Sequence, residues 1–102
     1  MSIRSAVSDD GSAVTIHIDG RFDASSLEDF RHSYENVESQ DVKQYIVDLG
    51  ETIHLDSSAL GMLLVLRDHA GGDNSDIVVS NCSPEIKKIF AISSFERLFT
   101  IA

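Results

Sequence analysis

The hydrophobic and polar positions near the start of the chain alternate with a period of two. In "AVTIHID", residues 13–19, valine and isoleucine alternate with polar side chains, which is the pattern of a strand with one buried face. The preceding "DDGS", residues 9–12, is typical of a turn. We therefore expect residues 3–8 to pair back onto residues 13–19 as a hairpin.

The apolar positions then change to a helical period. Those that recur at this spacing are Leu27, Phe30, Tyr34 and Val37. The spacing predicts a helix over residues 25–37, and Ser25 with Glu28 fits a capping box at its start. Next comes "QYIVDLG", residues 44–50, which is short, apolar and β-branched, as in a strand buried on both faces. A loop is expected between this strand and Asp56.

A second predicted helix begins at Ser57 and is apolar on nearly every side. One side carries Leu60, Leu63, Leu64 and Arg67, and the other carries Ser58, Met62, Val65 and His69. Because the first side offers enough leucines to fill a core, we expect it to pack on the sheet. Met62 and Val65 are then expected to lie on an exposed stripe.

The rest of the chain predicts one more strand and one more helix. "GGDN", residues 71–74, ends the second helix, and "DIVVS", residues 76–80, has the composition of a strand. Ser83 and Pro84 suit the N-cap and first position of a helix whose inner face is Ile86, Ile89 and Phe90. "FERLFTIA" predicts a short helical turn and a terminal strand. Alternating strands and helices indicate one α/β domain over residues 1–102, with helices packed against a mixed four- to five-stranded sheet.

Composition narrows the range of partners. The chain has 102 residues, a length that suits one small domain. Its formal net charge of −9 disfavours direct binding to nucleic acid or to anionic membranes. Cys82 is the only cysteine, and no signal peptide or membrane-spanning stretch is evident. We expect a cytoplasmic protein, with a monomer as the default.

The stretch "IHLDSSALGMLLVL", residues 53–66, places a carboxylate and two hydroxyls directly before an apolar run. Asp and Ser are common helix N-caps, so one of these residues is expected to be a cap. A cap needs only one side chain, so at least one hydroxyl is left to point elsewhere. A phosphate added to a hydroxyl at a helix N-terminus is tolerated by the helix dipole.

This stretch also resembles a family signature. "IVDLGETIHLDSSALGMLLVL" is similar to the STAS family of bacterial anti-sigma factor antagonists, in which a buried strand and a loop lead to Asp-Ser-Ser or Asp-Ser-Thr at the start of an apolar helix. "IDGRFDASS", "VVSNCSPEIKKIF" and "FERLFTI" extend the resemblance over nearly the whole chain. It implies that Ser57 is phosphorylated by a serine kinase. Ala59 stands where the family usually has Gly, whereas Gly61 follows the family pattern.

The resemblance implies a partner-switching mechanism. The unmodified protein is expected to bind a kinase-type anti-sigma factor or related switch protein, to be released when Ser57 is phosphorylated, and to be reset by a serine phosphatase. The residues expected to bind the partner are Asp56, Ser58, Ala59, Gly61, Met62 and Val65. No enzymatic activity and no cofactor are expected. The alternative is a STAS scaffold or adaptor in another signalling or transport assembly, such as a stressosome-like or lipid-transport complex.

Other site chemistries are disfavoured by spacing. The four histidines are dispersed and have no zinc-like pattern. A serine hydrolase needs an elbow such as G-x-S-x-G, and "DSSAL" lacks its first glycine. A receiver domain would use an Asp at the end of a central strand, as Asp48 nearly is, but "AVTIHIDG" lacks the acidic pair that such a domain places after its first strand.

Overall fold

The computed structural model describes residues 2–37 and 42–102. Its centre is a five-stranded sheet with the order β1-β2-β3-β4-β5. The strands are β1 (Ser2–Val7), β2 (Ala13–Phe22), β3 (Gln44–Leu55), β4 (Ile77–Ser80) and β5 (Thr100–Ile101). β1 is antiparallel to β2, whereas β2, β3, β4 and β5 pair in parallel. The sheet is therefore mixed, and the predicted α/β class is confirmed.

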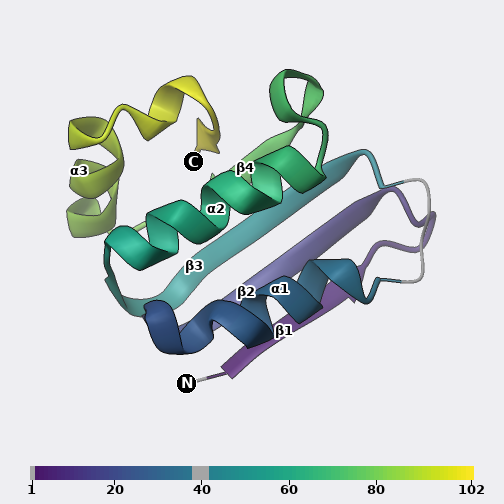
Figure 1. Ribbon diagram of the computed structural model, residues 1–102, viewed down its shortest axis with the longest axis horizontal. Helices are drawn as coiled ribbons and strands as arrows, with labels where there is room; N and C mark the ends of the chain where they lie inside the picture. The colour runs from purple at the N-terminus through teal and green to yellow at the C-terminus, as the bar shows by residue number, and fades with distance from the viewer. Residues whose placement is uncertain (1, 38–41) are drawn as a thin grey trace.

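The helices are α1 (Leu27–Glu35), α2 (Ser57–His69) and α3 (Pro84–Ile92), with short 3₁₀ turns η1 (Ala24–Ser26), η2 (Gly72–Asn74) and η3 (Phe95–Arg97). Figure 1 shows α1 and α2 side by side on one face of the sheet, both beginning at the same end of the molecule. This arrangement brings the starts of two helices together, although they are far apart in the sequence.

The N-terminal hairpin forms as predicted. β1 pairs with β2 from Ser2 opposite Asp19 to Val7 opposite Val14. On β2 the side chains of Val14, Ile16 and Ile18 are almost fully buried. The alternation in the sequence therefore reports a strand with one face on the core.

β3 differs from the prediction in both length and burial. It is buried on one face through Tyr45, Val47 and Leu49, while the residues between them are only half-buried. It also continues to Leu55, so residues 51–55 are strand and the predicted loop is wrong. The cause is irregular pairing with β2, whose register shifts twice along the ladder. Such bulges break the period of two that makes a strand recognisable in sequence.

The start of α1 also differs from the prediction. Asp23 caps the η1 turn by accepting a hydrogen bond from the backbone N–H of Ser25 at 3.0 Å. The Ser26 hydroxyl in turn accepts from the Asp23 backbone N–H at 3.2 Å. This reciprocal pair is the capping box, so the predicted pairing of Ser25 with Glu28 is wrong. The 3₁₀ turn moves the cap two residues earlier than the helical period indicates.

The predicted orientation of α2 is partly wrong. The residues of α2 that are buried against the sheet are Ala59, Met62, Leu63 and Leu66. Leu63 therefore faces the core as expected, but Leu64 is 40% exposed and Met62 only 5%. Positions 59, 62, 63 and 66 form one stripe at helical spacing. An apolar residue on nearly every side of the helix left its rotation undetermined by sequence.

The C-terminal third of the chain follows the prediction closely. The Ser83 side chain caps α3 by accepting from the Ile86 backbone N–H at 3.2 Å, with Pro84 at the first helical position. Ile86 and Phe90 are buried and Ile89 packs partly against the core. The predicted short turn and terminal strand are η3 and β5.

Adjacent leucines on α2 should respond differently to truncation. Leu63 is fully buried, so Leu63→Ala should cost about 2–5 kcal/mol of unfolding free energy. That loss should lower the Tm by about 8 °C or more, because about 1 kcal/mol moves a domain of this size by roughly 4–8 °C. Leu64→Ala is the matched control and should shift the Tm much less. Equal losses in thermal melts followed by circular dichroism would contradict this orientation of α2.

Candidate functional site

The site begins where β3 leads into α2. Asp56 is the N-cap: its backbone is extended, and its carboxylate accepts a hydrogen bond from the Ala59 backbone N–H at 3.2 Å. Of the residues expected to supply a cap, it is Asp56 that does so, and the two serines that follow lie in the first turn of the helix. Leu55 before them and Ala59 after them are both buried. The turn is fixed at both ends, so the conformation of the serines between them is set by the fold.

Both serine side chains face solvent. Ser57 and Ser58 are exposed, and neither hydroxyl makes a hydrogen bond to any residue that the structure describes. Ser57 is the first residue of α2, where backbone N–H groups are free and the helix dipole is positive. A phosphate on Ser57 would therefore be compatible with the helix. The Ser57 hydroxyl is therefore accessible as an acceptor for a phosphoryl group.

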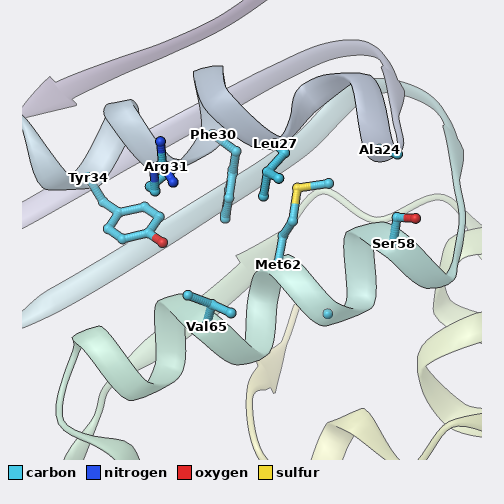
Figure 2. Close-up of a pocket in the computed structure, with 9 residues that line it drawn as sticks. Ala24, Leu27, Phe30, Arg31, Tyr34, Ser58, Met62 and Val65 are labelled. Carbon is cyan, nitrogen blue, oxygen red and sulfur yellow. The ribbon is translucent and has the colours of Figure 1, made fainter.

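A mostly apolar groove lies beside the serines, between α1 and α2. Its volume is about 560 Å³. Figure 2 shows Leu27 of α1 and Met62 of α2 directed toward one another across it, with Ser58 at one end and Tyr34 toward the other. Phe30 lies between them on the α1 side. The Ser58 end of the groove is thus one residue from Ser57.

Charge at the groove is concentrated on α1. Arg31 lines the groove and lies 3.8 Å from a carboxylate oxygen of Glu28 and 3.5 Å from one of Glu35. The side chains of Glu28 and Glu35 are themselves 77% and 46% exposed. The guanidinium is therefore already accompanied by two negative charges, and the α1 rim is acidic overall.

Of the six predicted partner-binding residues, Asp56 is the cap described above, and the other five fall into an exposed group and a buried group. Ser58, Gly61 and Val65 are exposed, and all three line the groove. Ala59 is fully buried, so it cannot contact a partner through its side chain, and that assignment is wrong. Met62 is 5% exposed, so its predicted place on an exposed stripe is wrong as well. Its side chain forms part of the groove floor instead.

The α1 wall of the groove was missed by the sequence analysis. Leu27 is 51% exposed, although it recurs at helical spacing with Phe30 and Tyr34, which are buried. A helical period identifies an apolar stripe but does not show where that stripe leaves the core. The pairing of α1 with α2 is a tertiary feature, and nothing in the local sequence indicates it.

A second polar cluster surrounds Asp48 on β3. One carboxylate oxygen lies 2.8 Å from the His17 ring Nδ1, and the other accepts hydrogen bonds from the Asn81 side chain and the Gly50 backbone N–H, both at 2.9 Å. Burial opposes ionisation of Asp48, but these hydrogen bonds outweigh it and hold the pKa of the carboxyl below its ordinary value. The cluster ties β2 and β3 to the residue after β4. Its hydrogen bonds leave Asp48 a structural role.

Within the described ranges 2–37 and 42–102, no three side chains of His, Cys, Asp or Glu converge as metal ligands. None of the helices there combines the length and the apolar character that crossing a bilayer requires.

Comparisons with known proteins agree with this fold. The family described as "Mlab, STAS domain" matches residues 5–100. A STAS-domain containing protein of Pseudomonas aeruginosa (strain UCBPP-PA14) is 55% identical over 102 residues, covering 100% of both chains. The chain therefore belongs to the STAS-domain family.

Solved structures show the same fold at low sequence identity. The anti-sigma factor antagonist SpoIIAA in its unphosphorylated form has a TM-score of 0.69 at 19% identity, covering 94% of this chain and 96% of that one. The phosphorylated form of the Bacillus cell fate determinant SpoIIAA has a TM-score of 0.73 at 20% identity, with coverage of 99% and 91%. An anti-sigma factor antagonist from Mycobacterium paratuberculosis has a TM-score of 0.75 at 17% identity, with coverage of 98% and 85%.

The Asp48 cluster predicts a specific pH dependence of stability. Because the folded-state pKa of Asp48 is lowered, its ionised form stabilises the fold above the unfolded pKa of about 3.9, and this contribution is lost as pH falls through the folded pKa. Asp48→Asn should therefore have a lower Tm than the native protein near neutral pH. The difference should shrink as the pH falls below about 4. Asp9→Asn, in the exposed β1–β2 turn, is the control. A Tm difference for Asp48→Asn that does not vary with pH in calorimetry would contradict the account.

Proposed function

We propose that the protein is an anti-sigma factor antagonist that works by partner switching. In its unmodified form it binds a kinase-type anti-sigma factor or a related switch protein, which then releases its other client. Phosphorylation of Ser57 ends this interaction, and a serine phosphatase restores it. The protein is a binder and a kinase substrate in this cycle, and the catalysts are its partners.

The observation that carries the proposal is the exposed Ser57 hydroxyl at the first position of α2. Asp56 caps the helix, so Ser57 is not needed for that purpose. Its neighbours in the turn are held by buried side chains on either side. A hydroxyl that is accessible and unpaired among the described residues is free to enter the catalytic site of a kinase and attack the γ-phosphorus of ATP. The STAS family and its antagonist-like fold neighbours support the same role.

The proposed modification is a simple phosphoryl transfer. The partner kinase transfers the γ-phosphoryl group of ATP to Ser57 Oγ, a base of the kinase takes the hydroxyl proton, and ADP leaves. The phosphatase hydrolyses the ester with water, which returns serine and inorganic phosphate. Since the first step needs ATP, we place the cycle in the cytoplasm.

Release follows from charge and size at the interface. Phosphate adds about −1.5 to −2 charges and a bulky tetrahedral group. During docking, Ser57 must face the site where the kinase holds the nucleotide phosphates, so the new phosphate meets like charge there. The protein already carries a net charge of −9, which deepens any local repulsion. Refolding is not required, because an anion at a helix N-terminus is compatible with the helix dipole.

A scaffold role is the second candidate, and one comparison favours it. A sulfate transporter family protein from Wolinella succinogenes has a TM-score of 0.72 at 13% identity, covering 93% of this chain and 80% of that one. In a scaffold or transport assembly the same domain would bind its neighbours whatever the state of Ser57. Dependence of binding on phosphorylation therefore separates the two functions.

Variants of Ser57 should differ in their affinity for the partner according to the charge at this position. Ser57→Ala should bind the kinase-type partner constitutively, because it removes only the acceptor. Ser57→Asp should bind more weakly, and enzymatically phosphorylated protein should bind more weakly still, since Asp carries less charge than phosphate. Ser5→Asp, on the exposed strand β1, adds the same charge elsewhere and serves as control. Equal affinities of the unmodified and phosphorylated proteins in isothermal titration would contradict partner switching and favour the scaffold.

A kinase assay should separate the two adjacent serines. With the partner kinase and ATP, Ser57→Ala should take up no phosphate, whereas Ser58→Ala should remain a substrate. Both are single-atom truncations at exposed positions of the same helical turn, so they are matched in their effect on the fold. Phosphate found by peptide mapping on Ser58 alone would overturn the assignment.

A further inference from the structure

Gly61 is unexplained by the fold of the protein itself. It lies in the interior of α2, where glycine is less favourable than alanine because it loses more backbone entropy on folding. Apart from its two chain neighbours and the nearby backbone of α2 itself, a Cβ added at this position would have no atom of the described residues within 4 Å. The space above Gly61 is therefore open, and the fold of the described chain does not require a glycine here.

This open space belongs to the groove between α1 and α2. Gly61 lines the groove together with two apolar side chains that remain half exposed, Leu27 at 51% and Val65 at 56%. They stand on opposite walls, Leu27 on α1 and Val65 on α2, above a floor that includes Met62 (Figure 2). Glycine on a helix surface permits another backbone to approach closely. The groove thus combines apolar anchors with a point of close approach.

We propose that this groove binds an amphipathic helix of the switch partner, with apolar side chains seated between Leu27 and Val65 and the helix backbone passing close to Gly61. The proposal rests on the proposed function, because it assigns the groove to that partner. With Ser57 alone, the partner would contact only the start of α2. The groove extends the partner-binding surface to α1. Helices laid into apolar grooves bind through side chains at such helical spacing.

The charge of the groove indicates that the polar side of this helix is basic. Arg31 is the one charged side chain among the described residues that line the groove, and Glu28 and Glu35 both lie within ion-pair distance of it. Two carboxylates around one guanidinium leave the rim negative, on a protein whose net charge is −9. A fatty acid or another small anion would meet repulsion at this rim. A helix flanked by Lys or Arg would gain attraction and a faster encounter.

The position of the groove relates it to the switch. Ser58 lines one end of it, so a helix that fills the groove would lie against the residue next to Ser57. The groove would then supply affinity and choice of partner, while the state of Ser57 decides whether the complex persists. These are separable contributions from neighbouring parts of one surface.

The test uses a synthetic helical peptide with leucines on one face and lysines on the other, titrated into the full-length protein and followed by amide NMR. Shifts are expected to concentrate on α1 and on the Gly61 side of α2. Leu27→Lys should weaken binding about tenfold or more, as expected for a central interface anchor, and Ile92→Lys, at an 85% exposed residue of α3, is the control that should not. A peptide with glutamates in place of the lysines should bind more weakly.

Gly61 provides the sharpest variant, because fold and binding should change in opposite directions. Gly61→Ala should raise the Tm by about 2–8 °C, because alanine has the higher helix propensity. The same change should lower the affinity for the peptide. Gly61→Leu should block the groove and reduce binding about tenfold or more. Peptide affinity unchanged in both Gly61→Leu and Leu27→Lys would overturn the proposal.

The remaining outcomes identify other occupants and also overturn it. Laurate serves as a fatty-acid probe. If laurate shifts the amide resonances of the groove and the peptide does not, the groove is a lipid site. Groove shifts that depend on protein concentration without peptide would assign it to a second copy of the chain. The kinase-type partner separates this proposal from the proposed function. If Leu27→Lys binds it as the native protein does and phosphorylation still abolishes binding, the groove proposal fails and partner switching stands. If Leu27→Lys weakens binding and phosphorylation has no effect, partner switching fails and the groove proposal stands.

Discussion

Burial of Leu55 and Ala59 on either side of a three-residue turn is the constraint on which the site depends. Both side chains lie in the core, at 5% and 0% exposure, so the chain between them has little freedom. Asp56 uses that turn to cap α2, and Ser57 and Ser58 are left facing solvent. The methyl group of Ala59 is part of the core, so the alanine that replaces the usual family glycine is absorbed by packing. One local constraint thereby produces a helix start, a free hydroxyl and one end of a groove.

Much of the fold could be predicted because its signals are local. Alternation in β2, the turn before it, and the Ser83-Pro84 start of α3 each depend on residues within one element, and all are confirmed. The cap at the start of α2 was predictable for the same reason. The candidate acceptor Ser57 came from a family resemblance, and the structure supplies the exposure that makes it physically reasonable.

The features that could not be predicted arise from contacts between elements. The bulges that lengthen β3 depend on its pairing with β2. The rotation of α2, which buries Met62 and exposes Leu64, depends on how the helix sits on the sheet and beside α1. The groove requires both helices, so its α1 wall has no signature in either segment alone. The sequence therefore indicates which end of the molecule carries the proposed function. The shape of the binding surface at that end depends on tertiary packing and could not be predicted.

The central claim is that the state of Ser57 is the signal that this protein carries. Its most direct test is intact-mass analysis of the protein purified from its own cells, before and after phosphatase treatment, with the modified residue located by peptide sequencing. The account predicts a population heavier by one phosphate, converted by phosphatase to the unmodified mass, with the phosphate on Ser57. A protein that carries no phosphate under any growth condition, or carries it only at another residue, would contradict it.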